Sequence, residues 1–257
     1  MPKVEVTERE IQEALDLSAQ RDFSTALALY QEMLIRAQDD QIRMRILFGI
    51  VTCSTWLNLD EIRENAIAVL KQFPDYGVSH AFVVMAQARA YSESERAQEA
   101  LDLIDGNLKD EVLQRDGFRD WKYEHLFYKG RSLVQLARYD EALGAFEEAH
   151  RVYPEGDFEV DMLIERSNCF LALRRFSEAY DAASQVLARG DEEMATLAMQ
   201  HMAECRMWQS RAPEALELFV AIQKRLPCRL VDEERIQTGI KNAMAYLEKR
   251  HPQGKPS

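Results

Sequence analysis

Residues 126–154 are the most regular stretch of the chain, and they read as two amphipathic helices joined by a short turn. Gly130 on the first helix has no side chain, and Ala142 and Ala149 on the second carry one methyl group each. Small residues at such positions let two antiparallel helices approach closely. Pro154 cannot continue a helix, so it ends the second one.

Weaker copies of this stretch recur along the chain. They share a residue equivalent to Ala142, followed in most copies four residues later by an apolar side chain such as Phe146. In the second copy, which is degenerate, we assign this place to Ile62. The anchors are Ala26, Ile62, Ala100, Ala142, Ala179 and Ala215, separated by 36, 38, 42, 37 and 36 residues. The longest step contains extra residues around 110–120, predicted to form an extended turn with Gly117 as a breaker.

This pattern resembles the tetratricopeptide repeat. That repeat has the form W-x2-L-G-x2-Y, then A-x3-F, then P, within about 34 residues. The best copy in this chain keeps the Gly, Ala, Phe and Pro of the pattern and replaces its Trp, Leu and Tyr. The matching residues are Leu126, Lys129, Gly130, Leu133, Ala142, Phe146 and Pro154. The resemblance implies an all-α, right-handed superhelical solenoid of helix-turn-helix units.

The repeat predicts a single solenoid over residues 1–250. Its six units cover approximately residues 7–38, 43–74, 81–108, 119–154, 157–190 and 192–227. A capping helix over 232–250 is expected because a repeat array leaves its last apolar face uncovered. Thr7 and Glu10 have the spacing of a capping box at the first helix. The tail 251–257 has no hydrophobic anchor, and we predict that it is disordered.

The composition excludes several classes of function. The chain has 257 residues, and its net charge is −12. This charge argues against nucleic acid as the main partner, because phosphate binding needs a basic face. No apolar run approaches the roughly 18 residues of a membrane span, and the first residues are polar and charged, unlike a secretory signal. We therefore expect a cytoplasmic protein without a membrane segment.

The sequence carries no recognised catalytic or phosphate-binding motif, so we expect no cofactor and no enzyme activity. Cys53, Cys169, Cys205 and Cys228 lie far apart. We expect buried reduced thiols there; a metal or redox pair is the alternative, but zinc-type spacing is missing. His201 and Cys205 are four residues apart on one predicted helix, but two ligands do not make a metal site.

In tetratricopeptide arrays the first helix of each unit lines a concave groove, so the resemblance implies three rows of inward-facing residues. The first row contains Leu15, Val51, Arg89, Arg131, Asn168 and Glu204. The second row contains Ile11, Leu47, Met85, Phe127, Ile164 and Gln200. The third row contains Ser18, Ser54, Ser92, Val134, Leu171 and Met207, with Trp208 beside the last. These rows predict an apolar groove in the first two units and a polar strip in the middle units.

The polar strip consists of Arg89, Arg131 and Asn168. Guanidinium and amide groups hydrogen-bond a carboxylate or an extended backbone, and arginine does so in bidentate fashion. The alternative is that the arginines are ordinary surface residues paired with acids such as Glu93 or Glu124. The predicted partner-binding residues are Met85, Arg89, Phe127, Arg131, Asn168, Leu171 and Trp208.

We interpret the chain as a non-catalytic scaffold or adaptor that binds a peptide or helix of another protein in this groove. The strip would orient an acidic or carboxyl-bearing segment of the partner. The clamp by which some members of the family grip chaperone tails is not present in the first unit, where Ile11 and Leu15 take the places of basic and amide residues. The alternative is a self-associating assembly factor, a homo-oligomer formed through the groove or an end face.

Overall fold

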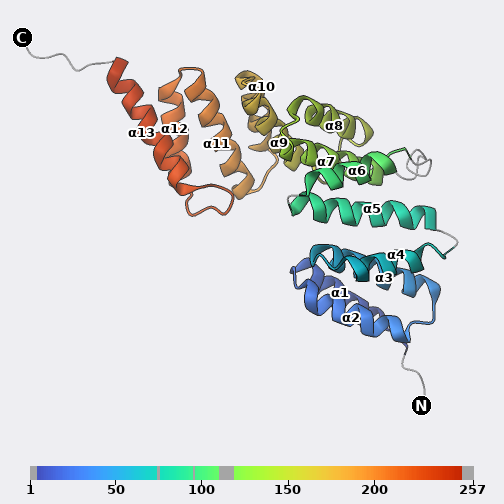
Figure 1. Ribbon diagram of the computed structural model, residues 1–257. Helices are drawn as coiled ribbons and strands as arrows, with labels where there is room; N and C mark the ends of the chain where they lie inside the picture. Colours follow the sequence, from blue (N-terminus) through green and yellow to red (C-terminus); the bar gives the residue numbers. More distant parts are fainter. Residues whose placement is uncertain (1–4, 74–75, 95, 110–118, 251–257) are drawn as a thin grey trace, which may run out of the picture. The chain divides into compact units, whose positions relative to one another are not determined.

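The computed structural model describes residues 5–73, 76–94, 96–109 and 119–250, and these residues form thirteen helices and no strand (Figure 1). The predicted tail at 251–257 and most of the predicted extended turn, including Gly117, lie outside the described residues. The chain separates into two compact units, residues 1–136 and 137–257. The boundary between them falls inside the stretch 126–154, the most regular repeat of the sequence.

Unit 1 contains three helix pairs followed by one more helix. Its helices are α1 (Glu8–Ala19), α2 (Phe23–Arg36), α3 (Asp40–Trp56), α4 (Asp60–Leu70), α5 (Tyr76–Glu93), α6 (Ala97–Asn107) and α7 (Arg119–Gln135). We call the first helix of each pair an A helix and the second a B helix. The A helices α1, α3, α5 and α7 pack on one another in sequence, and each B helix packs against a neighbouring A helix. Unit 1 is therefore a two-layer stack of helices (Figure 1).

Unit 2 follows the same rule. Its helices are α8 (Tyr139–Val152), α9 (Glu159–Ala172), α10 (Phe176–Val186), α11 (Glu192–Trp208), α12 (Ala212–Gln223) and α13 (Glu233–Arg250). The A helices are α9 and α11, and α13 takes the place of a further A helix because it packs on both α11 and α12. The predicted capping helix 232–250 thus corresponds to α13, which covers the apolar side of α12.

A small side chain one turn into most of the B helices sets their packing. The fourth residue is alanine in five of the six helices α2, α4, α6, α8, α10 and α12, and each of these alanines is 0% exposed. They are Ala26, Ala100, Ala142, Ala179 and Ala215. Because alanine has only a methyl group as its side chain, the neighbouring helix can lie close to the B-helix axis at this level.

The anchor of the second copy, in α4, differs from the prediction. The fourth residue of α4 is Arg63, so Ile62, which we assigned from the sequence, stands one residue too early. Arg63 is buried, and its guanidinium forms ion pairs with Asp60 at 2.7 Å and Glu64 at 3.3 Å. A long aliphatic stem can be buried while the charged head reaches acids at the surface. This is why an arginine can replace the alanine, and why the pattern was hidden.

The turn between the A and B helices is built in the same way in at least five pairs. The residue two positions before the B helix has a positive φ of 55–63°, although none of these residues is glycine. They are Arg21, Asn58, Ala137, Arg174 and Ser210. In four of the five turns the next N–H donates to the carbonyl five residues back, as from Arg175 to Phe170 at 2.8 Å. This left-handed residue closes the A helix and turns the chain back.

The capping box predicted at the first helix is confirmed. The Thr7 hydroxyl accepts from the backbone N–H of Glu10 at 3.3 Å, and the Glu10 carboxylate accepts from the backbone N–H of Thr7 at 2.8 Å. The Thr7 amide, and after it Arg36 at 2.7 Å, lower the pKa of Glu10 to about 2. The first helix therefore starts at a fixed residue and is tied to the end of α2.

We expect Ser210→Gly to raise the free energy of unfolding by roughly 0.5–1 kcal/mol, because glycine removes the steric cost of a left-handed backbone at φ 61°. The control is Ser24→Gly in the exposed first turn of α2, which should lower the free energy of unfolding by a similar amount. Thermal unfolding followed by circular dichroism measures both. Equal losses in the two variants would contradict the assigned turn.

A second matched pair tests how closely α13 approaches α12. A Cβ added at Gly239 would lie 2.5 Å from the ring of buried Phe219, whereas one added at Gly144 would meet nothing within 4 Å. Gly239→Ala should therefore destabilise unit 2 by about 1–3 kcal/mol. Gly144→Ala, in the exposed face of α8, should stabilise it by roughly 0.5–1 kcal/mol. Chemical denaturation should place the two variants on opposite sides of the parent.

Candidate protein-binding surfaces

The three rows of A-helix residues differ sharply in exposure. In the first two pairs, Ile11, Leu47 and Val51 are buried in the core, and only Leu15 of the predicted apolar set is exposed. The expectation of an apolar groove in the N-terminal part of the chain is therefore wrong. The physical reason is that each A helix is covered by a B helix and by neighbouring A helices, so most of its apolar face is used for packing.

The second row is part of the framework along the whole chain. Phe127 is 3% exposed, and Ile164 and Gln200 are also buried, while Met85 is half-buried. The first row, four residues further along each helix, is the more open one in the middle pairs: the Arg89 side chain is 59% exposed, and Arg131 and Asn168 are half-buried. A binding surface on the A helices is therefore presented by the first row.

The predicted residues are divided between the two units. Met85, Arg89, Phe127 and Arg131 lie on α5 and α7 in unit 1, and Asn168, Leu171 and Trp208 lie on α9 and α11 in unit 2. Each set is therefore described within its own unit. In unit 2 the Asn168 amide donates to the Glu165 carboxylate at 3.4 Å, and half-buried Leu171 packs against the apolar cluster of α9 and α10.

Arg89 belongs to a three-residue ion-pair cluster in unit 1. Its Nε lies 3.2 Å from one carboxylate oxygen of Glu93, and the other oxygen accepts from Arg21 at 2.8 Å. The Glu93 side chain is only 14% exposed, whereas those of Arg89 and Arg21 are 59% and 66% exposed. One inward carboxylate thus holds two outward guanidinium groups, so these three residues carry one net positive charge, and the Glu124 carboxylate also acts on Arg89. The pairing with Glu93 that we weighed as the alternative is present.

Buried Tyr128 lies close to this cluster. Burial raises the pKa of the Tyr128 phenol, and Arg89 counteracts part of that rise. The pKa of Arg89 is raised although burial works against it, because the charges of Tyr128, Glu93 and Glu124 favour the guanidinium ion. Arg131 Cζ lies 5.9 Å from the centre of the Phe127 ring. Arg131 is therefore positioned beside a buried aromatic ring, whereas Arg89 is held by Glu93.

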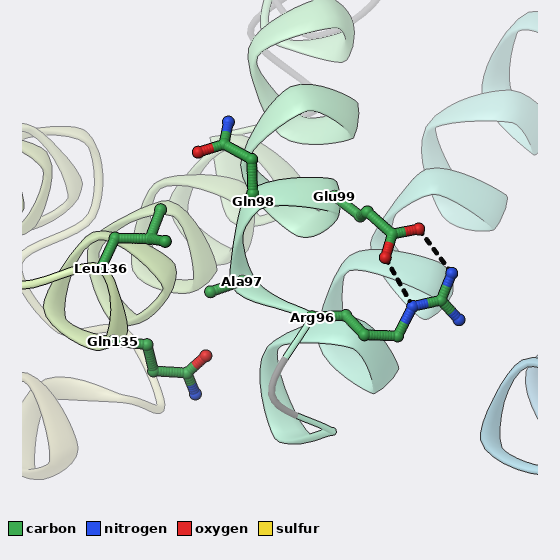
Figure 2. Close-up of a pocket in the computed structure, with 6 residues that line it drawn as sticks. All are labelled: Arg96, Ala97, Gln98, Glu99, Gln135 and Leu136. Atoms are coloured by element: carbon green, nitrogen blue, oxygen red, sulfur yellow. Dashed lines mark hydrogen bonds and ion pairs between the residues drawn. The ribbon is translucent and has the colours of Figure 1, made fainter.

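A wide hollow of about 640 Å³ lies at the start of α6 and the end of α7 (Figure 2). Arg96 faces Glu99 across two hydrogen bonds of 2.7 and 2.5 Å, and it also donates to Asn58 at 3.2 Å. Gln135 donates to the backbone carbonyl of Ser92. The charges in this hollow neutralise each other, and its polar groups are already hydrogen-bonded. The hollow is therefore a poor site for a charged ligand.

A second hollow, of about 410 Å³, lies in unit 2 between α11, α12 and α13. We call it the Trp208 hollow. Its lining residues are Glu204, Met207, Trp208, Phe219, Arg235, Thr238, Gly239 and Asn242. Trp208 is 60% exposed and stacks on Phe176 with ring centres 5.6 Å apart. The hollow combines an open aromatic wall with polar side chains from α13.

The charged groups of the Trp208 hollow are engaged with each other. One oxygen of Glu204 accepts from the Gln200 amide at 3.0 Å, and the other accepts from Arg235 at 2.8 Å. Phe219 forms the base of the hollow beside Gly239, where a side chain would collide with its ring. Glu204 and Arg235 at the rim are therefore tied to each other and Thr238 and Asn242 are exposed, while Trp208 supplies exposed apolar surface beside half-buried Met207.

Three residues of unit 2 that could perform chemistry, Ser167, His201 and Cys205, are buried. Ser167 donates to the Ala179 carbonyl at 3.0 Å, so its oxygen accepts from Nδ1 of His201 at 3.1 Å. Burial, and to a lesser extent Arg235, lowers the pKa of His201 to about 4, while burial raises the pKa of Cys205 to about 12. At neutral pH His201 is therefore an uncharged imidazole and Cys205 an uncharged thiol, and both are shielded from solvent. Within the described ranges, no group of three or more His, Cys, Asp or Glu could hold a metal ion.

The architecture has counterparts among solved structures. The pilF protein of Pseudomonas aeruginosa aligns with a TM-score of 0.62 and 12% identity, covering 90% of this chain and 95% of that one. A Rap protein complexed with competence and sporulation factor aligns with a TM-score of 0.58 and 16% identity, over 95% of this chain and 76% of that one. A thermophilic TPR protein of Thermus thermophilus has a TM-score of 0.49 and 16% identity, with coverage of 93% and 98%.

The chain has a tetratricopeptide repeat fold. At these identities the likeness concerns the fold alone. No protein-family model matches the sequence, and no curated protein matches it. None of the helices in the described ranges is long and apolar enough to cross a membrane.

One regularity of this tetratricopeptide fold was missed in the sequence. Four B helices are preceded by an arginine whose guanidinium binds the glutamate three residues later, in the pattern Arg-x-x-Glu-Ala. The pairs are Arg96–Glu99, Arg138–Glu141, Arg175–Glu178 and Arg211–Glu214. Because these pairs are exposed and screened by water, each contributes little to the free energy of unfolding. The Arg-x-x-Glu-Ala pattern was visible in the sequence. Since these four arginines are ion-paired within their own repeats, we do not count them among those available to a partner.

We expect the stability of unit 2 to fall as the pH drops from about 6.5 to about 4. In this window the unfolded chain binds a proton at His201 that the folded chain does not, which costs up to about 3 kcal/mol. His201→Gln should reduce the pH dependence of the free energy of unfolding, whatever its effect at pH 7. The control is His150→Gln, at an exposed position of α8. Denaturant melts at pH 7, 6, 5 and 4.5 compare the slopes, and an unchanged slope in His201→Gln would contradict the assignment.

Proposed function

We propose that the protein is a non-catalytic interaction scaffold whose A helices bind a peptide or helix of a partner protein. The observation that carries this proposal is the first row in the middle of the array, where Arg89 is exposed and Arg131 and Asn168 are half-buried. In unit 1 the guanidinium groups of Arg89 and Arg131 stand over a buried layer that contains Phe127 and Tyr128. Such rigidly supported cations favour an acidic or carboxyl-bearing segment.

Two further observations support binding rather than catalysis. A protein of the same fold, the Rap protein, has been crystallised in complex with competence and sporulation factor, so this arrangement of helices is able to present a binding surface. Ser167, His201 and Cys205 of unit 2, which are close to one another in the fold of α9 and α11, are buried. Asn168, Leu171 and Trp208 lie in unit 2, and we propose them as a second contact surface.

An apolar groove in the first two pairs would favour the self-associating alternative, which could also use an end face. Ile11, Leu47 and Val51, which were to form it, are buried in the core. We therefore favour a separate partner protein over a second copy of the chain. Sedimentation of the isolated protein tests this choice, since a stable homo-oligomer would restore the alternative.

We expect the double variant Arg89→Glu/Arg131→Glu to lose a partner that the parent captures from a cell lysate. Charge reversal places two acids where the partner's acidic segment would lie, and the expected loss is at least tenfold in captured material. The matched control is Arg9→Glu/Arg225→Glu, which has the same change in net charge at exposed positions of α1 and of the segment after α12. Arg89→Gln/Arg131→Gln serves as a milder variant.

Circular dichroism and thermal unfolding should first establish that the variants fold like the parent. A protein retained by the control and lost from both Arg89/Arg131 variants would identify the partner and the surface. Identical capture by all four proteins would refute a role of the arginines, and attention would move to the surface in unit 2.

A further inference from the structure

A stack of arginine, phenylalanine and tryptophan recurs in the two units. In unit 1, Phe23 at the start of α2 stacks on Trp56 at the end of α3, with ring centres 5.1 Å apart and planes inclined by 5°. Arg21 Cζ lies 5.2 Å from the centre of the Trp56 ring. Arg21 is the left-handed residue of its turn, with φ 63°. The stack therefore joins the turn of one helix pair to the A helix of the next pair.

Unit 2 repeats this construction with Arg174, Phe176 and Trp208. The rings of Phe176 and Trp208 are 5.6 Å apart and inclined by 3°, and Arg174 Cζ lies 5.1 Å from the centre of the Trp208 ring. Arg174 is again the left-handed residue of its turn, with φ 60°. A cation at such a distance from an indole is attracted by the ring, so the guanidinium is held in place.

The two stacks differ in what the arginine meets. In unit 1, Glu93 from α5, the A helix that follows Trp56, accepts from Arg21 at 2.8 Å. The next A helix in unit 2 is α13, and the side chains it contributes beside Trp208 are Arg235, Thr238 and Asn242, none of them acidic. Among the residues that the structure describes, none places a carboxylate within 4.0 Å of the Arg174 guanidinium. The acid that completes the first stack is missing from the second.

The nearest acid in the Trp208 hollow cannot take this role without losing its own bonds. Both oxygens of Glu204 are engaged, one by Gln200 and one by Arg235. Beside the stack lies an open hollow of about 410 Å³, which is in the range of about 300–1,000 Å³ typical of ligand sites; Trp208 lines it, and Arg174 is not among its lining residues. Trp208 forms its wall and is 60% exposed, whereas Trp56 is half-buried.

We propose that an acidic segment of a partner protein binds across Trp208: its carboxylate pairs with the Arg174 guanidinium over the indole, and its neighbouring large apolar side chain enters the Trp208 hollow and packs on Trp208 and Met207. Unit 1 provides the template, because there a glutamate of the chain itself completes the same stack. This inference rests on the proposed scaffold function and adds to it a location and a ligand chemistry. The Thr238 and Asn242 side chains stand at the rim, where they can hydrogen-bond the backbone of an extended segment.

The test uses a library of random dodecapeptides displayed on phage and selected on the full-length protein, followed by affinity measurement with the synthetic peptides that are enriched. We expect enriched peptides to carry Glu or Asp next to Leu, Phe or Trp. Their affinity should fall at least tenfold in Arg174→Glu and in Trp208→Ala. A smaller loss is expected in Arg174→Gln, which removes the charge without reversing it.

The matched control is Arg225→Glu, since Arg225 is an exposed arginine of the same unit that belongs neither to the stack on Trp208 nor to the lining of the hollow. It should bind the peptides like the parent. Replacement of the acidic residue of an enriched peptide by its amide should produce the same loss as Arg174→Gln, and the two changes together should cost little more than either alone. Circular dichroism of each variant excludes unfolding as the cause.

Several results would overturn the proposal. These are a selection that enriches no peptide, enriched peptides without acidic residues, or affinities that Arg174→Glu leaves unchanged. Peptides that depend on Arg89 and Arg131 in place of Arg174 would refute this site while supporting the scaffold function. A dimer of the isolated protein that Arg174→Glu dissociates would make a second copy the occupant, and would also overturn the proposal as stated.

Discussion

The close contact at the fourth residue of each B helix is the constraint on which the rest of the structure depends. Where this residue is alanine, the neighbouring helix lies against a methyl group that is completely buried. Arg63 keeps the same place in α4 only because its guanidinium reaches acids at the surface. With the anchor at Arg63, the first three copies are separated by 37 and 37 residues, so the repeat is regular where the sequence looks degenerate.

Much of the fold follows from the sequence because it depends on local patterns. Alanine spacing, the capping box at Thr7 and the polar ends of the last helix predict helix pairs and their order. The prediction failed in two kinds of place. The first is Arg63, where a charged residue is buried. The second is a position whose residue types carry no special signal. The left-handed position in the turns is of the second kind, since arginine, asparagine, alanine and serine all occupy it in place of glycine.

The candidate surfaces were harder to predict, because they depend on which turn of each A helix its neighbours cover. Sequence spacing aligns Ile11, Phe127 and Arg89 with groove positions but does not say that the first two are buried. It also does not show that Glu93 holds Arg89 and Arg21 together, since 72 residues separate Arg21 from Glu93. Trp208 was found because an aromatic residue beside a row of apolar residues is conspicuous, whereas its stack with Arg174 needs the folded turn.

The buried thiols can report local opening of the structure. Cys53 lies in unit 1 and Cys169 and Cys205 lie in unit 2, all fully enclosed, and burial raises the pKa of each. An alkylating reagent attacks the thiolate, so each of these cysteines reacts only when its own helices separate. The natural chain thus carries independent chemical reporters in its two parts. Reaction rates at single cysteines would measure how strongly each repeat is held by its neighbours, without any introduced label.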